Sequence, residues 1–168
     1  WTKRGAFIGA MQIVKTIQHD FPTLNVLALD SMRINSTITT SGNLTAMLSK
    51  TKLFVDTIIE LTPKNGFYTN EVSKVGYPVV KGFPYPWEFE MVRERKDTTM
   101  PKLLLISDSF GGNLFPYISE PFSRSVKIFD SWQYKLNEEI VIAEKPDVVV
   151  LIVLESNIRN MLKYLSLK

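Results

Sequence analysis

The sequence predicts an α/β fold around a mostly parallel central sheet, on the strength of two apolar runs and the order of the segments near them. The runs Leu103–Ile106 and Asp147–Leu154 have the unbroken apolar character of buried parallel strands. From residue 101 onward, strand and helix patterns alternate in the order β-α-β-α-β-α. This order calls for parallel strands joined by right-handed crossovers.

Residues 5–20 are predicted to form an amphipathic helix that ends at Pro22. Its apolar side chains recur on one face at helical spacing (Phe7, Ala10, Met11, Val14, Ile17 and Phe21). His19, the single histidine of the chain, falls on the opposite, polar face. We therefore interpret His19 as a surface residue and not as a catalytic base.

The next segments are predicted as short strands with polar stretches between them. Leu24–Leu29 and Thr57–Leu61 are apolar enough for strands, and residues 89–93 alternate apolar and charged side chains as a half-exposed strand does. A stretch rich in Ser, Thr and Asn runs through Thr40, and a short helical pattern starts at Ser41.

Residues 63–86 contain four prolines and are predicted to be mainly loop. Aromatic side chains are frequent from Phe67 to Trp87. Such a loop can line a sugar-binding cleft, or it can cap the hydrophobic core.

The remaining elements follow the strand at Leu103–Ile106. They are predicted as a helix with Leu114, Ile118 and Phe122, a strand at Ser125–Phe129, a helix with Leu136, Ile140 and Ala143 that ends before Pro146, and a closing helix at Ile158–Leu165.

The composition is that of a soluble globular protein, with 168 residues, 45% hydrophobic and 22% charged, and it predicts a single domain over residues 1–168. The net charge of +3 comes from scattered basic residues, which gives nucleic-acid binding little support. The absence of cysteine excludes disulfides, thiolate metal sites and cysteine nucleophiles. No apolar run reaches the length of a membrane span, and no signal peptide is present. Because the chain begins at Trp1 without methionine, we expect that residues preceding it were removed.

A candidate nucleophile lies at the end of the first apolar run. The sequence Ser107-Asp108-Ser109-Phe110 follows the strand directly, and Gly111-Gly112 leads into the helix. This order puts a serine hydroxyl at the carboxyl edge of the sheet, where open α/β sheets bind ligands, beside helix N–H groups that can stabilise an oxyanion. Asp and Ser are also favoured helix N-caps, so a purely structural role for the turn is the alternative.

A second polar tip strengthens the interpretation of Ser109 as a nucleophile. Glu155-Ser156-Asn157 follows the apolar run that ends at Leu154. Two polar tips at the carboxyl ends of parallel strands are typical of a site at a sheet edge. The alternative of an unrelated α/β domain with a capped helix at Asp108 predicts that the tips at Ser109 and Glu155 do not share a pocket.

Three sequence segments resemble the SGNH-hydrolase-like domain of alginate O-acetyltransferase (AlgX/AlgJ-type) proteins. They are KLLLISDSFGGNLFPYISEPF, KPDVVVLIVLES and WTKRGAFIGA, and Ser41-Gly42-Asn43-Leu44 is similar to a Ser-Gly-Asp-Leu element of that family. The resemblance spans nearly the whole chain through short motifs, with a poorly matched middle. It implies a three-layer sandwich of flavodoxin-like architecture.

The resemblance implies a serine-dependent O-acetyltransferase or acetylesterase acting on a cell-surface or exported polysaccharide. Ser109 would be the nucleophile, and the N–H groups of Ser109, Gly111 and Gly112 would form the oxyanion hole. The candidate substrate-binding residues are Asp108, Asn113, Glu155, Ser156, Asn157 and Trp1. No metal or dissociable cofactor is required. The expected partners are the polysaccharide, an acetyl donor or donor protein, and a membrane-bound acetylation complex, in the periplasm or outside the cell.

The chain departs from that family at three points. If Trp1 is the tryptophan of the family's Asp-x-His-Trp motif, the catalytic Asp and His lie just before residue 1, and the fragment itself is expected to be inactive. Ser156 stands where the family has Arg, and Asn43 replaces the usual aspartate. These differences leave open an alternative function as an inactive carbohydrate-binding or assembly module of the same fold.

Overall fold

A five-stranded mixed sheet forms the centre of the protein. The computed structural model describes residues 2–39, 55–77, 90–129 and 138–159, together with Leu162. The sheet order is β3 (Asn70–Val72), β4 (Met91–Glu94), β6 (Arg124–Phe129), β5 (Lys102–Ser107) and β7 (Val148–Ile152). Strand β5 pairs in parallel with both β6 and β7, whereas β4 runs antiparallel to β3 and β6. The predicted α/β fold with a parallel centre is confirmed.

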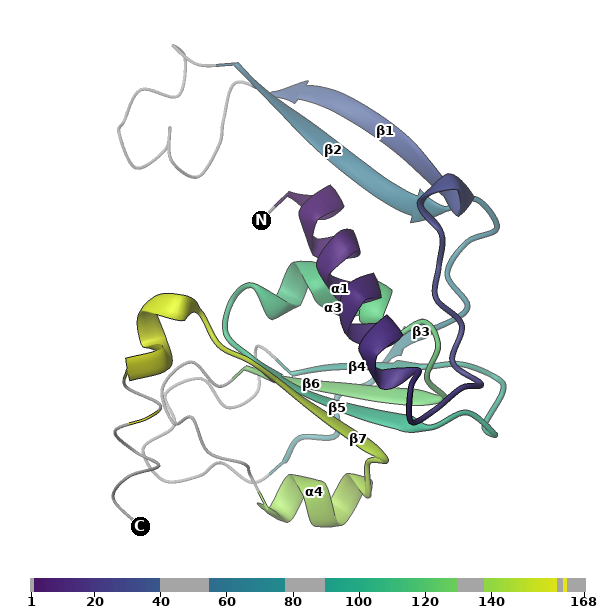
Figure 1. Ribbon diagram of the computed structural model, residues 1–168, viewed down its shortest axis with the longest axis vertical. Helices are drawn as coiled ribbons and strands as arrows, with labels where there is room; N and C mark the ends of the chain where they lie inside the picture. The colour runs from purple at the N-terminus through teal and green to yellow at the C-terminus, as the bar shows by residue number, and fades with distance from the viewer. Residues whose placement is uncertain (1, 40–54, 78–89, 130–137, 160–161, 163–168) are drawn as a thin grey trace.

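Helices cover both faces of this sheet (Figure 1). On one face lie α1 (Lys3–Ile17) and α3 (Gly111–Ile118), and on the other lies α4 (Glu138–Glu144). Alternate residues of β5 serve the two cores: Leu103 and Leu105 pack with α1 and α3, whereas Leu104 and Ile106 pack with Val126 and Ile140 on the α4 face. Because both faces of β5 are covered, its apolar run is unbroken.

Helix α1 forms as its sequence predicts. The Thr2 hydroxyl accepts a hydrogen bond from Gly5 N at 3.1 Å and caps the helix. The buried face contains Phe7, whose ring meets Tyr117 of α3 edge to face with 5.5 Å between centroids. This contact fixes the two helices against each other.

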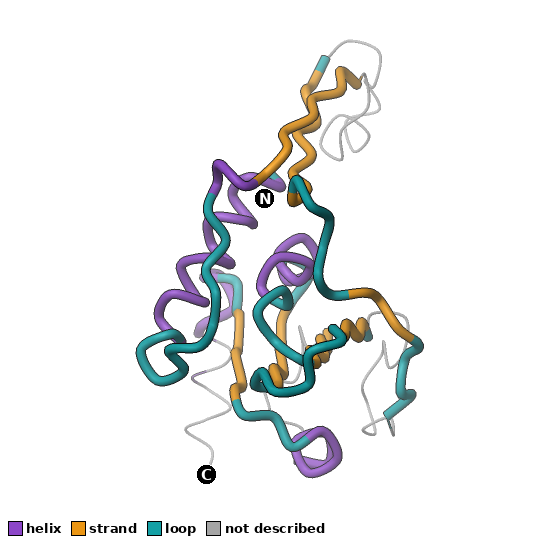
Figure 2. Tube along the Cα trace, turned by 90° about the vertical axis from the view of Figure 1, so that its right-hand side faces the viewer, coloured by secondary structure: helices purple, strands orange, loops and turns teal. Residues whose placement is uncertain are grey.

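A two-stranded hairpin of β1 (Met32–Thr39) and β2 (Asp56–Pro63) extends away from the central sheet (Figure 2). At its base Leu61 joins the core on the α1 face, and the Leu61 carbonyl accepts a hydrogen bond from the Tyr117 hydroxyl at 3.0 Å. Burial is the main cause that raises the pKa of this phenol. The hydroxyl therefore stays a donor and ties the hairpin to α3.

One strand prediction in the first half is wrong, and one strand was not predicted. Leu24–Leu29 is not a strand: the Leu24 side chain is buried, but its carbonyl accepts a hydrogen bond from Gln18 Nε2 at 2.8 Å instead of joining a ladder. The segment ends in the short 3₁₀ helix η1 (Leu29–Ser31). The polar stretch after it is strand β1, whose side chains are mostly exposed, so apolar patterning could not reveal it.

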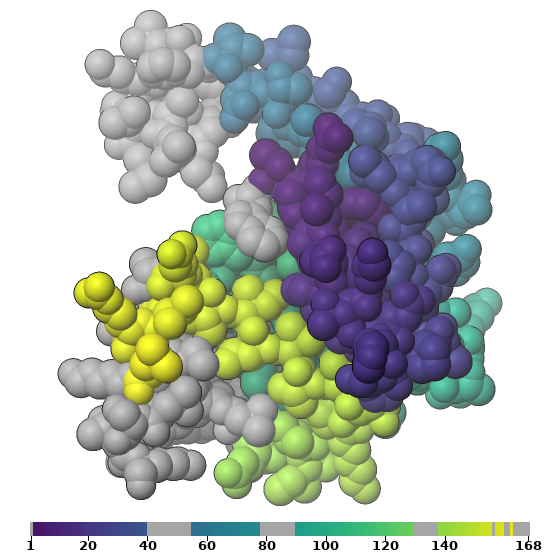
Figure 3. All heavy atoms as spheres, viewed as in Figure 1, coloured from purple at the N-terminus to yellow at the C-terminus, as the bar shows by residue number. Residues whose placement is uncertain are grey.

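Strand β7 differs from its prediction as a buried strand. It lies at the edge of the sheet, and alternate side chains such as Val149 and Leu151 are both 43% exposed. Figure 3 shows this strand and the 3₁₀ helix η2 (Glu155–Asn157) at the surface of the molecule. An apolar run in the sequence predicts a strand, but it does not show whether that strand lies at the edge or at the centre of the sheet.

Some of the remaining sequence predictions are confirmed, and others lie partly outside the described residues. β3 lies within the predicted loop 63–86, and the rest of that loop from residue 78, like the helical pattern at Ser41, lies outside the described residues. The closing helix at Ile158–Leu165 also lies mostly outside them. The strands near residues 57–61, 89–93 and 125–129 and the helix before Pro146 are confirmed, with ends that differ by a few residues.

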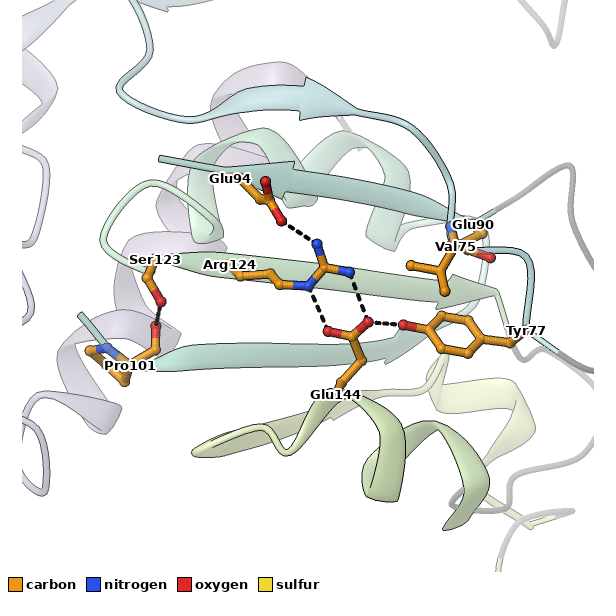
Figure 4. A network of polar contacts seen from close by, with 8 residues as sticks. All are labelled: Val75, Tyr77, Glu90, Glu94, Pro101, Ser123, Arg124 and Glu144. Carbon is orange, nitrogen blue, oxygen red and sulfur yellow. Dashed lines mark hydrogen bonds and ion pairs between the residues drawn. The ribbon is translucent and has the colours of Figure 1, made fainter. Parts of the chain in front are cut away.

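A polar network fixes the amino end of β6 on the α4 face (Figure 4). The Arg124 guanidinium donates to both carboxylate oxygens of Glu144, at 2.6 and 2.8 Å, and also pairs with Glu94. The Tyr77 hydroxyl donates to the same Glu144 carboxylate. Burial raises the pKa of Glu144, so the paired guanidinium offsets a desolvation cost.

Two leucines on adjacent strands test this account of the core. Leu105 of β5 is fully buried, whereas Leu151 of β7 is 43% exposed. We expect Leu105→Ala to lower the free energy of unfolding by about 2–5 kcal/mol, because it leaves a cavity in a packed core. Leu151→Ala should cost about 1 kcal/mol or less, since half of its surface already meets water. Urea denaturation followed by circular dichroism measures both; equal losses would contradict the described layering.

Candidate functional site

The predicted nucleophile Ser109 is exposed at the carboxyl end of β5. Residues 108–110 form the turn between this strand and α3, which begins at Gly111. The helix follows within two residues of the serine, so the positive end of its dipole lies beside the hydroxyl. The turn thus places a serine where the sequence predicts one.

The Asp108 carboxylate holds this turn to the neighbouring strand. It is buried, and Oδ1 accepts a hydrogen bond from Phe110 N at 2.9 Å while Oδ2 accepts one from Leu154 N at 2.7 Å. The first bond closes an Asx turn, and the second joins the end of β5 to the residue that precedes η2. The Ser109 turn is therefore held beside the start of η2.

The N-cap interpretation of the turn is only partly correct. Phe110 occupies the N-cap position of α3 and makes no side-chain cap hydrogen bond. Asp108 instead stabilises the turn that precedes the helix, two residues before the cap. Its structural role is thus to link two strand ends rather than to satisfy the helix N–H groups.

Gly111 is required by close packing under the turn. A Cβ at this position would overlap the side chain of Ser107 and lie 3.3 Å from Lys127 Cε, whereas a Cβ at Gly112 would meet nothing within 4 Å. The Gly111 N–H donates to the Asp108 carbonyl at 3.2 Å. The N–H of Gly112 belongs to the first turn, whose donors have no intrahelical acceptor, and it remains a candidate for the oxyanion hole.

Lys127 of β6 lies beneath this turn and was not foreseen from the sequence. Its side chain is only 3% exposed, on the same face of the sheet as α3. Burial lowers the pKa of its ammonium to about 8; the Asp108 carboxylate opposes this shift, and the Lys74 ammonium adds to it. The available signal was a lysine at an alternating, inward position between Val126 and Ile128.

Unpartnered hydroxyls accompany the lysine. Ser107 and Ser125 are buried, and within the described part of the chain neither hydroxyl has a hydrogen-bond partner. Both lie on neighbouring strands of the same sheet. Buried polar groups without partners are rare in native proteins, and they concentrate where a structure serves chemistry rather than packing.

The other predicted site residues are placed as follows. Asn113 is half-buried on α3, Glu155 is exposed in η2, Ser156 and Asn157 belong to the same short helix, and Trp1 lies outside the described residues. His19 is exposed, with 89% of its side chain accessible, and pairs with Asp20 at 3.0 Å. The interpretation of His19 as a surface residue is confirmed.

A cavity of about 390 Å³ lies elsewhere, at the amino end of β5 beside Met100. Its walls include Asn25, Tyr68, Arg95 and Glu120. The Arg95 guanidinium lies 5.9 Å from the centroid of the Tyr68 ring, and this ring is 56% exposed. An exposed aromatic ring in a polar cavity can stack against a small polar ligand.

The described residues contain neither a group of metal ligands nor a membrane-spanning helix. In these parts of the chain no three His, Cys, Asp or Glu side chains are grouped as a metal ion would require. No helix in the same parts has the length and apolar character needed to cross a membrane.

Comparison with known proteins gives a likeness in structure. No family model matches the chain, and neither does the sequence of any curated protein. The structure of Bacillus cereus PatB1 with a sulfonyl adduct matches with a TM-score of 0.66 and 16% identity, covering 94% of this chain and 58% of that one. A second PatB1 structure matches at 0.63, with 16% identity and coverages of 94% and 60%.

A DHHW family protein from Eubacterium siraeum also matches, with a TM-score of 0.66, 13% identity, and coverages of 91% and 56%. The likeness is one of fold. The chain spans less than two thirds of the length of each of these proteins. Its α/β architecture is that of PatB1 and of the DHHW family protein.

Alanine at the two glycines tests the packing under the Ser109 turn. We expect Gly111→Ala to lower the free energy of unfolding by about 1–3 kcal/mol, because the added methyl group displaces Ser107 in a closely packed region. The matched variant Gly112→Ala should stay within about 1 kcal/mol of the wild type, since the position is open. Thermal or urea unfolding compares them; similar stabilities for the two variants would refute this packing.

Proposed function

We propose that this chain forms the serine-bearing part of a carbohydrate O-acetyltransferase or acetylesterase in which Ser109 is the nucleophile. The observation that carries the proposal is the exposed Ser109 at the carboxyl end of the parallel-paired strand β5, just before a helix and tied through Asp108 to the segment after β7. This is the position at which open α/β sheets place their ligands.

The comparisons add support of a limited kind. PatB1, which shares the fold, has a structure with a sulfonyl adduct, and covalent adducts of this kind form on activated nucleophiles. The name of the DHHW family spells Asp-His-His-Trp, in keeping with the Asp-x-His-Trp motif of the family that the chain resembles. We therefore propose a histidine as the base for Ser109.

The proposed chemistry proceeds in two steps. The Ser109 oxygen attacks the acetyl carbonyl of the donor, and its proton passes to the histidine. The tetrahedral oxyanion accepts hydrogen bonds from the N–H groups of Ser109 and Gly112, and Gly111 allows the helix to approach closely. Collapse breaks the bond to the donor oxygen, which takes the proton from histidine, and leaves acetyl-Ser109.

The second step transfers the acetyl group to an acceptor. A sugar hydroxyl, or water in an esterase, gives its proton to the histidine as its oxygen attacks acetyl-Ser109, and the serine is regenerated. By the resemblance to alginate O-acetylation proteins, we propose an exported or cell-surface polysaccharide as substrate, in the periplasm or outside the cell. The proposed source of the acetyl group is an acetyl donor or donor protein, and the proposed further partner is a membrane-bound acetylation complex.

Labelling with a fluorophosphonate tests the proposal in the full-length protein. We expect the wild type to be labelled and Ser109→Ala to lose the label entirely, because the alanine variant has no oxygen to attack phosphorus. Ser36→Ala is the matched control, since Ser36 is exposed on β1, in the hairpin, and should be labelled like the wild type. Mass spectrometry of the labelled peptide measures all three. A folded wild-type protein that takes no label at Ser109 and deacetylates no acetylated polysaccharide would refute the nucleophile.

The cavity at Tyr68 favours a second candidate function, a module that binds carbohydrate without acetyl chemistry. Its exposed ring and polar walls suit a sugar, whose C–H groups stack on aromatic faces. Both charged residues of the cavity already have partners: Arg95 pairs with Asp97 at 3.5 Å, and the Glu120 carboxylate accepts hydrogen bonds from Tyr68 N and Thr69, which fits a neutral ligand.

The second function predicts that polysaccharide binding depends on this cavity. Tyr68→Ala should weaken binding of a neutral oligosaccharide about tenfold, because a stacking contact contributes about 1 kcal/mol beyond its buried area. Tyr68→Phe keeps the ring and should bind nearly as the wild type does. Isothermal titration calorimetry distinguishes the two variants; binding that is insensitive to Tyr68→Ala would exclude the cavity as the binding site.

A further inference from the structure

A buried carboxylate holds the segment that carries Tyr68, the aromatic residue of the cavity at the amino end of β5. Glu120 lies just after α3 and is 2% exposed, whereas Tyr68 is 56% exposed. A buried carboxylate is tolerated in a fold only where hydrogen-bond donors satisfy its oxygens. The donors that face Glu120 therefore show what this residue holds in place.

Three donors from two neighbouring residues satisfy this carboxylate. Oε2 of Glu120 accepts a hydrogen bond from Tyr68 N at 2.8 Å. Oε1 accepts one from Thr69 N at 3.1 Å and one from the Thr69 hydroxyl at 2.6 Å. Hydrogen bonds to a charged acceptor are stronger than those between neutral groups. The backbone on both sides of the Tyr68–Thr69 peptide bond is thus fixed to the end of α3.

Arg93 of β4 holds Thr69 from another side. Its Nε donates to the Thr69 hydroxyl at 2.9 Å, and its Nη2 donates to the Thr69 carbonyl at 2.7 Å. The hydroxyl has a single hydrogen, so it accepts from Arg93 and donates to Glu120. All three residues are buried. A chain of hydrogen bonds therefore runs from the guanidinium through Thr69 to the carboxylate.

Glu120 also fixes a second side chain of the cavity. Its backbone carbonyl accepts a hydrogen bond from Arg95 Nη1 at 3.3 Å. The Arg95 guanidinium lies 5.9 Å from the centroid of the Tyr68 ring. The carboxylate thus holds the backbone that carries the ring, and the carbonyl of the same residue holds the cation that lies over it.

We propose that Glu120 is the positioning residue of Tyr68: its carboxylate, held through Thr69, fixes the backbone so that the ring keeps the orientation in which a neutral sugar stacks. The inference rests on the second candidate function, the binding of carbohydrate at this cavity. A ring that is fixed before binding loses little conformational entropy when the ligand arrives. Glu120 raises the affinity in this way without a bond to the sugar.

The first test measures hydrogen exchange at the Tyr68 amide in the full-length wild-type protein by NMR. Amides of exposed residues usually exchange quickly, but the bond to Glu120 should slow exchange at this position at least about tenfold relative to an unstructured peptide. The measurement needs no variant and no ligand. A Tyr68 amide that exchanges at the rate of an unstructured peptide would overturn the inference.

The second test removes one acceptor of the carboxylate. Glu120→Gln keeps the shape of the side chain but replaces one oxygen with an NH₂ group, which cannot accept from the backbone. We expect the Tyr68 amide to lose its protection and the affinity for cellohexaose or maltohexaose to fall about threefold, because the ring must be ordered at each binding event. Isothermal titration calorimetry measures the affinity. Glu71→Gln is the matched control, since it removes the same charge from an exposed position on β3 and should change neither result.

Two substitutions at Thr69 test the same chain of hydrogen bonds without altering the carboxylate. Thr69→Val removes the hydroxyl and with it the bonds to Arg93 and Glu120, whereas Thr69→Ser keeps them. We expect the serine variant to retain the protection of the Tyr68 amide and the valine variant to lose it. If Glu120→Gln does not fold, this pair decides the question. Equal protection in the two variants would overturn the inference.

The outcomes distinguish this inference from the proposed carbohydrate binding. A Tyr68 amide that is protected in the wild type and not in Glu120→Gln, in a protein that binds neither hexasaccharide, would support the positioning of the ring and count against the carbohydrate module. Sugar binding that is weakened by Tyr68→Ala but unchanged in folded Glu120→Gln would overturn the positioning role and leave the cavity as the binding site. A Glu120→Gln variant with a lower melting temperature and an unchanged affinity would show a purely structural carboxylate, which also overturns the inference.

Discussion

The candidate site depends on one buried carboxylate that joins two strands. Each oxygen of Asp108 accepts one backbone N–H, from Phe110 on its own turn and from Leu154, which lies between β7 and η2. Hydrogen bonds to a charged acceptor are stronger than neutral ones, and burial keeps water from competing for them. The position of the Ser109 hydroxyl is therefore set by the sheet, through its edge strand, and not by a cap of the helix.

Polar side chains fill the space under the Ser109 turn, where apolar side chains would pack more favourably. At its amino half, the α3 face of β5 is apolar through Leu103 and Leu105, but the face continues with Ser107, next to Lys127 of β6. Gly111 lets α3 descend onto these side chains, because any Cβ there would collide with the serine. The layer beneath the exposed serine thus carries polar side chains where a protein core normally carries apolar ones. Such departures from the usual core composition are expected at functional sites.

The sequence predicts elements well where burial creates a pattern and poorly where it does not. The strand at Leu103–Ile106 and the turn at Ser109 were predictable, since a doubly covered strand is an apolar run and its end is marked by polar residues. Strand β1 was not, because its side chains are mostly exposed and its partner β2 holds it by backbone pairing. The burial of Lys127 could not be predicted either, because it depends on which turn lies above β6.

The two ends of the sheet hold their buried charged groups in different ways. At the amino end Arg124 is shared between Glu94 and Glu144, so the network satisfies its charges internally and fixes α4 to the sheet. Towards the carboxyl end, burial lowers the pKa of the Lys127 ammonium, which lies 5.7 Å from the centroid of the Phe129 ring. The buried Asp108 carboxylate is engaged there by the backbone N–H groups of Phe110 and Leu154. Because both of its oxygens accept from the backbone, this carboxylate fixes the turn that carries Ser109 to the segment after β7.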